Sequence, residues 1–503
     1  MIHPGLSSAW TLPVPVAMLA VACWVFFSFP TTTLTGPSIS FSKLPLLRPL
    51  FRFLVSQTRF LLLLKLVFLA LFMLVIVAGL WGSPIGARNI STVLTWNLWW
   101  TGVIVSVLFI GSSWCAVCPW DMIANLLVRR TLWRKAVAPS RLNFTVPRIF
   151  RNLWPALALL TVFTWLELGF DVTDSPYATA SLALLMIVLA TVALVLYEDK
   201  AFCRYFCPVG RTIGVYSQLS SVALRPVESK VCESCSTLDC YHGNEKIDAC
   251  PTKLVMGSLR ESTYCISCGN CTQSCPTDNI NWQLRSPSVE ALQDARPHVD
   301  EACFMIGLLA LTSFHGITML PAWHEAISGL GRAIGDSGQL IAAFTIVMLS
   351  YLILTFIVYG AFAYAFRLMN GKSDYLQVCS GFAFASLPVA FTYHVAHNLS
   401  HLLRESGDMP QVFLDPLGWN ALPLTMAEEH QRAMDTLVST DAIAAMQVGL
   451  VIFGFWLSMR VVKHRGFQMF AATRVQLLPM IAFCVLITAV SVWLLSQPMF
   501  VRM

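Results

Sequence analysis

Apolar stretches long enough to cross a lipid bilayer fill most of this sequence. A transmembrane helix needs roughly 20 consecutive apolar residues to cross about 30 Å of hydrocarbon. The chain is 56% hydrophobic and 12% charged, which excludes an ordinary soluble globule. We therefore expect an all-α polytopic membrane protein with about ten transmembrane helices. The expected spans lie near residues 14–30, 60–81, 93–113, 152–170, 177–197, 302–320, 338–366, 379–401, 442–459 and 477–496.

The spans divide the chain into three regions. Residues 1–197 form an N-terminal five-helix membrane block, residues 198–300 a polar region without spans, and residues 301–503 a C-terminal five-helix membrane block. No Lys or Arg precedes the stretch 14–30 and no small-residue cleavage site follows it. We therefore interpret this stretch as the first span and not as a signal peptide.

Basic residues concentrate in the loops on one side of the expected spans. The loop 129–151 is strongly basic, whereas the turn 171–174 on the other side is acidic. Because Lys and Arg mark cytoplasmic loops, we expect both termini outside and region 198–300 inside, in a bacterial inner (cytoplasmic) membrane. These loops account for the net charge of +6, so we expect no nucleic-acid partner. The outer loop 402–441 is expected to contain a small amphipathic helix.

Most of the 16 cysteines lie in closely spaced groups. The run from Cys265 to Cys275 reads C-x2-C-x2-C-x3-C-P, in which three thiolates bind one [4Fe–4S] cluster and the fourth binds a second cluster. A looser copy, C-x2-C-x4-C-x9-C-P, occupies residues 232–251. The crossed rule predicts two ligand sets: Cys232, Cys235, Cys240 and Cys275 for cluster one, and Cys265, Cys268, Cys271 and Cys250 for cluster two.

Paired C-x2-C motifs also occur in structural zinc sites. Eight cysteines with two Cys-Pro endings favour clusters. We therefore expect region 198–300 to be a small cytoplasmic α+β domain of the bacterial 2[4Fe–4S] ferredoxin type. Isolated cysteines in apolar runs are expected only to pack, because a small buried side chain is their usual role: Cys23, Cys303, Cys379 and Cys484.

Two further cysteine pairs follow expected spans. The segments 115–119 and 203–208 read C-A-V-C-P and C-R-Y-F-C-P, and each proline is expected to end a helix at the cytoplasmic face. Four thiols at one face fit a third metal centre, a pair of redox dithiols, or simple packing. Nearby Lys200, Arg204 and Arg211 favour the thiolate form. The four cysteines are Cys115, Cys118, Cys203 and Cys207.

Histidines lie inside the second membrane block, where polar side chains are costly. His394, His397 and His401 are spaced to share one face of a helix, and His315 lies in the sixth span. From the helical rise, His315 and His394 stand at similar depth in the outer half of the membrane. Four interpretations stay open: two axial ligands of haem b, a quinone site, a transition-metal site that includes His397 and His401, or hydrogen-bonded histidines between helices.

Other polar residues give weaker signals. Glu167, near the outer end of the fourth span, fits a quinol proton acceptor, although an interfacial carboxylate is the ordinary interpretation. His324, His430 and His464 lie in loops and are expected to be solvated. The sequence contains neither a Gly-rich dinucleotide motif nor a P-loop, which argues against nicotinamide or nucleotide chemistry.

The order of these motifs resembles the NapH/NosR/FixG-type membrane iron–sulfur proteins. Spans, a Cys-Cys-Pro segment, more spans, a second Cys-Cys-Pro segment and a double ferredoxin motif follow one another over residues 60–285. The family usually carries C-x3-C-P twice; the pair at 203–207 matches, whereas the pair at 115–118 is one residue closer. The resemblance implies electron transfer among the quinone pool, periplasmic partners and reductase or metal-handling systems. Region 301–503 looks like an added cytochrome b-type or quinone-reactive module.

Taken together, the motifs predict a membrane electron-transfer protein. We expect it to conduct electrons between cytoplasmic [4Fe–4S] clusters and a quinone or haem site in the outer half of the membrane, with other redox subunits as partners. One alternative is a copper or iron reductase or a metal-centre maturation factor, using outer residues such as Met409 and Met426. Another is a transporter or sensor whose clusters report the redox state.

Overall fold

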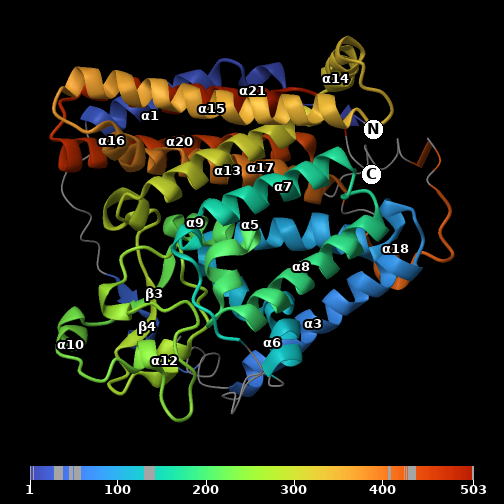
Figure 1. Cartoon of the computed structure of the whole chain (residues 1–503). Helices are drawn as coiled ribbons and strands as arrows, with labels where there is room; N and C mark the ends of the chain where they lie inside the picture. The colour runs from blue at the N-terminus through green and yellow to red at the C-terminus, as the bar shows by residue number, and fades with distance from the viewer. Residues whose placement is uncertain are drawn as a thin grey trace.

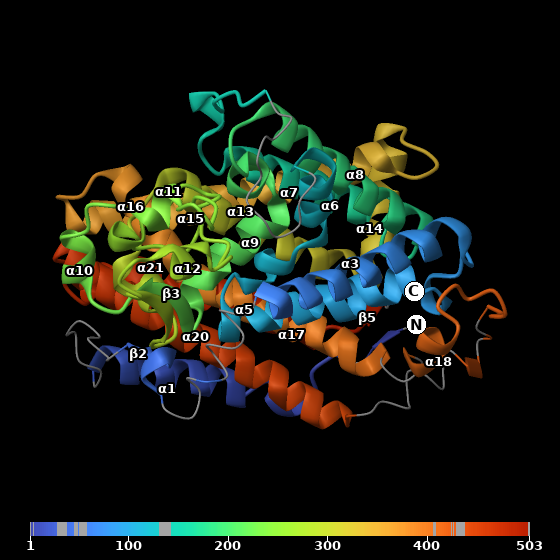
Figure 2. The same ribbon diagram turned by 90° about the horizontal axis from the view of Figure 1, so that it is seen from below.

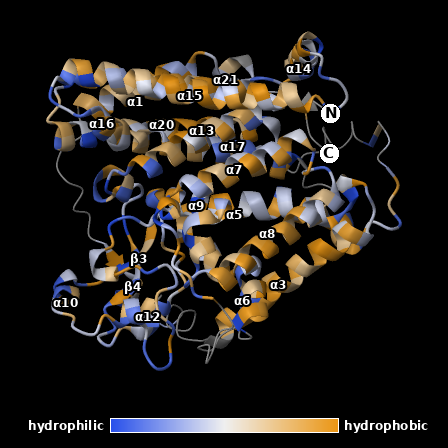
Figure 3. Ribbon diagram, viewed as in Figure 1, coloured by the Kyte–Doolittle hydropathy of each residue, from blue (hydrophilic) through white to orange (hydrophobic). Residues whose placement is uncertain are grey.

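The computed structural model describes residues 2–3, 5–27, 38–44, 49, 58–129, 142–405, 409–423, 425, 427–428 and 438–500. Within these ranges, eight helices are long and apolar enough to cross a membrane. Two shorter apolar helices, α1 (Pro13–Phe27) and α7 (Trp154–Gly169), lie at the other two expected spans. The chain is therefore a mostly helical, multi-pass membrane protein, as its hydropathy predicts (Figure 3).

The first membrane block contains one irregular span. In that span the π-helical segment Val93–Trp100 joins α4 to α5, and such wide turns re-aim the side chains that follow. The described helices of the block beside α7 are α3 (Thr58–Trp81), α4 (Ile90–Thr92), α5 (Thr101–Ile110), α6 (Pro119–Arg129), α8 (Pro176–Leu196) and α9 (Pro208–Tyr216).

The prolines after the two cysteine pairs begin helices. The sequence led us to expect that Pro119 and Pro208 end spans, but Pro119 is the first residue of α6 and Pro208 the first residue of α9. Proline suits this first position because its fixed φ is already helical and no N–H is needed there. Each cysteine pair therefore lies in the short turn between a span and a second helix.

The second membrane block is built around a buried helix. Its helix α17 is buried on nearly all sides, whereas α15 exposes most of its apolar side chains, as a helix facing lipid does. The described helices of this block are α13 (Val299–Thr318), α14 (Pro321–Ile334), α15 (Ile341–Asn370), α16 (Tyr375–Phe382), α17 (Leu387–Glu405), α18 (Met409–Leu414), α20 (Thr440–Phe470) and α21 (Leu478–Ser496).

Helix α1 packs against the second block, although it belongs to the first block in sequence (Figure 2). The rings of Trp24 and Trp456 stack with centroids 6.5 Å apart. Lys463 on α20 donates a hydrogen bond from Nζ to the Val25 carbonyl at 2.6 Å. The expected boundary at residue 197 therefore separates α1 from the helix that it contacts.

Both termini lie at one end of the helices, away from the cysteine-rich region (Figure 1). Strand β1 (Ile2–His3) pairs antiparallel with β5 (Met499–Phe500). The Phe500 amide donates to the carbonyl of Met319, directly after α13, at 2.8 Å. We call this end the far end and the opposite end the insert end. Helix α18 lies within the outer loop 402–441, and α14 is an additional helix that we did not predict.

The cysteine-rich region combines short helices with a small sheet. Strand β4 (Ile280–Leu284) lies between β3 (Val222–Pro226) and β2 (Ile39–Ser40), and both pairings are antiparallel. The short helices are α10 (Ser229–Glu233), α11 (Asp239–His242) and α12 (Asn270–Ser274). Strands and helices thus occur together in this region, while its ferredoxin character stays a prediction.

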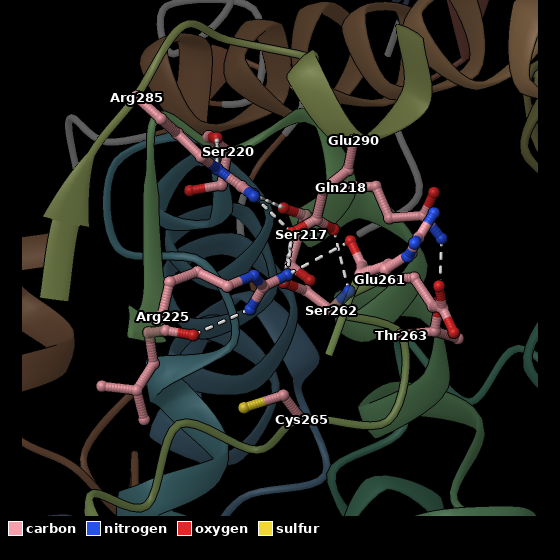
Figure 4. Close-up of polar contacts among 12 residues, drawn as sticks. Ser217, Gln218, Ser220, Arg225, Glu261, Ser262, Thr263, Cys265, Arg285 and Glu290 are labelled. Atoms are coloured by element: carbon pink, nitrogen blue, oxygen red, sulfur yellow. Dashed lines mark hydrogen bonds and ion pairs between the residues drawn. The ribbon is translucent and has the colours of Figure 1, made fainter. Parts of the chain in front are cut away.

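A buried carboxylate joins the loops of this region to the chain that follows α9 (Figure 4). Glu290 is fully buried and pairs with both Arg225 and Arg285. It also accepts hydrogen bonds from the amide and the hydroxyl of Ser262, each at 2.8 Å. Arg285 in turn donates to the carbonyls of Ser217 and Ser220, both at 3.1 Å, at the end of α9. Burial raises the pKa of Glu290, but the two arginines outweigh it and hold that pKa below its ordinary value.

The first prediction concerns this anchor. Glu290→Gln leaves two buried guanidinium groups without their counter-charge and should destabilise the insert by ~3–5 kcal/mol, measured by limited proteolysis against denaturant. Because the folded pKa of Glu290 is lowered, its stabilisation is complete above the ordinary pKa of about 4.3 and is lost as the pH falls through the lowered value. The Gln variant should lose this acid dependence.

Asp248→Asn is the control. Asp248 pairs with Arg129 at 3.8 Å, and 39% of its side chain is exposed, so the change should cost less than about 1 kcal/mol. Equal losses in the two variants would contradict an anchoring role for Glu290.

Candidate functional site

The eight cysteines of region 198–300 lie near one another in the structure. In the first set, Cys240 lies close enough to Cys232, Cys235 and Cys275 for a charge on any of them to raise its pKa. Asn279 joins the two distant motifs, because its side-chain Nδ2 donates to Cys232 Sγ and its amide donates to Cys275 Sγ, both at 3.4 Å. The fourth cysteine of the second motif therefore faces the first motif.

The second set is arranged in the same way. Cys271 lies within electrostatic range of Cys268, Cys265 and Cys250. Backbone amides point at its sulfur atoms: Leu254 N donates to Cys250 Sγ at 3.3 Å, and Ser267 N donates to Cys265 Sγ at 3.4 Å. Such donors stabilise the negative charge of thiolates and of the clusters they bind.

The two sets lie next to each other. Cys271 of the second set is also within electrostatic range of Cys240 of the first set. Among the described residues, no three Cys, His or carboxylate side chains lie close enough together to hold a single metal ion. A cluster has a different requirement, because it distributes its thiolates over separate iron atoms.

The four remaining cysteines of interest come together at the insert end of the first block. Cys115 lies within electrostatic range of Cys118, Cys203 and Cys207. We call these four residues the membrane-face cysteines. Burial raises the pKa of Cys118, Cys203 and Cys207 to about 12 each, and it outweighs the lowering effect of Arg211 and Lys200 that the sequence suggested. Free thiols in this group are therefore expected to be neutral at pH 7.

Three charged residues border the membrane-face cysteines. Arg211 is fully buried, donates to the Thr263 carbonyl, and has no hydrogen-bond partner for Nε or Nη2. Its charge acts on Cys115, Cys203 and Cys207. Lys200 pairs with Asp121 at 2.5 Å, and Asp121 Oδ1 lies 4.0 Å from Cys203 Sγ.

The second cysteine set lies against this group. Ser267, between Cys265 and Cys268, hydrogen-bonds through Oγ with Ser112 Oγ at 2.9 Å. The Lys200 amide donates to the carbonyl of Pro251 at 3.2 Å, next to Cys250. Cys268 itself is within electrostatic range of Lys200. The structure thus places three groups of four cysteines in series: the first set, the second set and the membrane-face cysteines.

An apolar cavity of about 550 Å³ lies in the first block, and residues next to these cysteines in sequence are among its lining. Its lining comes from α3, the span Val93–Ile110, α6, α7, α8 and α9. Pro119 and Pro208, which follow the cysteine pairs, lie at one end. Glu167 is the one ionisable side chain among its described lining residues.

The histidines of the second block divide into two groups. His315 Nδ1 lies 3.9 Å from Glu167 Oε1, and the His315 ring contacts His397 with centroids 5.2 Å apart. The centroids of His397 and His401 are 4.8 Å apart. Glu167, His315, His397 and His401 therefore form a row that starts at the cavity and continues along α17; we call it the Glu–His row.

His394 faces other partners. Its Nε2 accepts a hydrogen bond from Trp100 Nε1 at 3.2 Å, and its Nδ1 lies 3.3 Å from the Tyr216 hydroxyl. A haem between His315 and His394 would require both side chains to leave these partners, so the present arrangement does not fit it. Haem ligation stays a prediction that a reduced-minus-oxidised spectrum tests.

The other candidate residues have ordinary surroundings. Met409 is buried beside Ala78 and Ile90. His324 packs on Phe500 with centroids 5.8 Å apart, and His464 is partly buried. Met426 and His430 lie outside the described residues. Of the isolated cysteines, Cys484 is buried and Cys23 is exposed on α1.

The sequence did not lead us to the cavity, because its lining comes from six separate segments. One signal was present: Trp114 and Trp120 flank the segment C-A-V-C-P. The sequence shows these two tryptophans beside the cysteine pair. Only the folded structure brings the ring of Trp99 into contact with both of them.

The chain is similar over part of its length to several known proteins. A ferredoxin-type protein NapH of Haemophilus influenzae is 24% identical over 227 residues, which cover 40% of this chain and 73% of that protein. A putative electron transport protein of Escherichia coli, YccM, is 31% identical over 107 residues, 20% of this chain and 28% of that protein. An uncharacterised protein of Methanocaldococcus jannaschii is 24% identical over 36% of this chain and 75% of its own length. The chain is similar to NapH-like membrane iron–sulfur proteins.

These relatives support the NapH-like part of the resemblance and no specific NosR-like or FixG-like assignment. No family model matches the chain. No solved structure matches it either. Membrane electron transport and ferredoxin-type iron–sulfur chemistry are the properties that the names of the relatives suggest.

The second prediction tests the crossed ligand sets. Cys250→Ala should remove the same cluster signal as Cys268→Ala, and Cys275→Ala the same signal as Cys232→Ala, in electron paramagnetic resonance spectra of the reduced protein. Cys484→Ala, in the core of the second block, should leave both signals unchanged. Pairing by sequence order, with Cys250→Ala matching Cys232→Ala, would contradict the arrangement.

Proposed function

We propose that this protein conducts electrons between a quinone in the membrane and two [4Fe–4S] clusters in region 198–300. The observation that carries the proposal is the series of three cysteine groups that leads from the polar region to the membrane face. Cluster one is bound by Cys232, Cys235, Cys240 and Cys275, and cluster two by Cys265, Cys268, Cys271 and Cys250. Other redox subunits exchange electrons with cluster one, which lies furthest from the membrane blocks.

The membrane-face cysteines bind a third metal centre in this proposal. Four thiolates and a bound metal would be anionic, and a buried anion needs a counter-charge. Arg211 supplies one, since its guanidinium is fully buried and has two nitrogen atoms without a partner. Neutral dithiols or simple packing would leave that buried charge uncompensated, which costs several kcal/mol. This argument favours the metal centre over both alternatives.

The proposed orientation follows the basic loops. The insert end is cytoplasmic, and the far end, with both termini, is outside a bacterial inner membrane. The Glu–His row then leads from the cavity toward the outer face, a direction that suits the release of quinol protons.

The third prediction tests the third centre. Changing both Cys115 and Cys118 to Ala should lower the iron and sulfide content of anaerobically purified protein below that of the unchanged protein, while the content of region 198–300 stays at about eight iron and eight sulfide. Changing both Cys303 and Cys379 to Ala is the control, because these cysteines lie outside the three groups. Unchanged metal content in the first variant would contradict a third centre.

The fourth prediction tests the orientation. An alkaline phosphatase reporter, which is active only outside, should be active when fused after Met503 and inactive when fused after Ser286. The opposite pattern would contradict a cytoplasmic location of the clusters.

A further inference from the structure

We propose that the cavity of the first block is the quinone site and that the indole N–H groups of Trp114 and Trp120 bind the quinone ring. This inference rests on the proposed function and locates its membrane substrate. The histidines of the second block suggested a quinone site there, whereas this proposal places the quinone site in the first block.

Two unpaired donors point to the ligand. Trp114 Nε1 and Trp120 Nε1 are both buried, and neither has a hydrogen-bond partner among the described residues. A buried N–H without an acceptor costs about 1–3 kcal/mol, so an acceptor is expected in the bound state. Both side chains line the cavity. A quinone brings carbonyl oxygens, which accept hydrogen bonds of this kind.

The aromatic surroundings suit a flat ring. Trp99 lies between the two donors, with its ring centroid 5.7 Å from Trp114 and 5.7 Å from Trp120. Phe68 and Phe72 of α3 contact the outer sides of the same two indoles at 4.8 and 6.0 Å. Such rings prefer offset or edge-to-face contacts with another π system.

The remainder of the cavity suits an isoprenoid tail. Its volume of about 550 Å³ is that of a site for a medium-sized molecule, and its lining is predominantly apolar. Helix α3 forms one wall and exposes most of its other faces, so the tail reaches lipid beside it. An acyl chain of a lipid would fill the same volume but would leave the two indole donors unpaired.

The position of the ring suits electron transfer. Trp114 directly precedes Cys115, and Trp120 follows Cys118 by two residues. A ring held by these indoles therefore lies beside the membrane-face cysteines, and the second cysteine set lies directly behind them.

The protons have a separate route. Oxidation of a quinol breaks two O–H bonds and yields the quinone, two electrons and two protons. The two electrons would be accepted one at a time by the metal centre that the membrane-face cysteines would hold and by the two clusters that the other eight cysteines would hold. The protons pass to Glu167, the ionisable lining residue, and from it along His315, His397 and His401. Reduction of a quinone runs the same steps in reverse.

A glycine in the cavity allows a sharp test. A Cβ added at Gly102 meets no atom within 4 Å, and Gly102 lines the cavity. Gly102→Leu should therefore fill the site without disturbing the helices, and leucine also favours a helix over glycine. Gly449 on α20 is a matched control, because it is exposed, helical and equally free of neighbours, but lies outside the cavity.

The experiment measures the rate at which decylubiquinol reduces the clusters in proteoliposomes, with dithionite reduction as a check on the clusters. Gly102→Leu should lower the quinol rate at least tenfold and leave dithionite reduction unchanged, whereas Gly449→Leu should change neither. Changing both Trp114 and Trp120 to Phe should raise the KM for the quinol. Trp165→Phe is its control, because that indole donates to Thr345 Oγ1 at 2.8 Å outside the cavity.

A photoreactive azidoquinone identifies the site directly. Labelling of residues 94–120 that Gly102→Leu prevents would support the inference, and labelling confined to residues 301–503, with unchanged rates in both cavity variants, would overturn it. If the unchanged protein reduces its clusters with dithionite but never with quinol, the proposed function fails before the location of the site is tested.

Discussion

One buried carboxylate holds the loops of the cysteine-rich region to one another and, through Arg285, to the chain that follows α9. Glu290 is surrounded by Arg225, Arg285 and Ser262, and these residues come from β3, the segment after β4 and the loop before Cys265. Removing such an ion from water is costly, so the arrangement is stable only while every partner is present. The same contacts hold Cys265 and its neighbours at the insert end of the membrane blocks.

That fixed position explains why the cysteine groups follow one another. The loop that carries Ser267 contacts Ser112, and the chain beside Cys250 contacts Lys200. Short, rigid connections keep redox centres at constant separations, which electron transfer requires. Arg211 adds an electrostatic reason for the third group, because a buried cation favours an anionic centre beside it.

Hydropathy predicted the spans well because a membrane forces backbone polar groups into helices. It did not predict that α1 packs on α20, since a helix satisfies its own backbone hydrogen bonds and its apolar side chains can pack on any apolar neighbour. The π-helical segment Val93–Trp100 and the helix α14 also escaped prediction, since neither differs in composition from an ordinary span or loop.

The sequence predicts the motifs of the candidate site but not the contacts between them. The crossed cysteine sets follow from fixed spacings and stay a prediction, while the structure shows that the eight cysteines lie near one another. The convergence of Cys115 and Cys118 with Cys203 and Cys207 depends on how two spans pack, which local spacing does not encode. Helical phase placed His394 and His397 on one face, yet the neighbouring helices separate them: Trp100 and Tyr216 contact His394, whereas His315 contacts His397.

The central claim is that region 198–300 holds two [4Fe–4S] clusters. Mössbauer spectroscopy of anaerobically purified, iron-57-enriched protein tests it most directly, because each cluster type gives its own quadrupole doublet. The account predicts doublets of [4Fe–4S]²⁺ clusters that represent at least about eight iron atoms in each chain. Protein that contains zinc and shows no such doublet would contradict it.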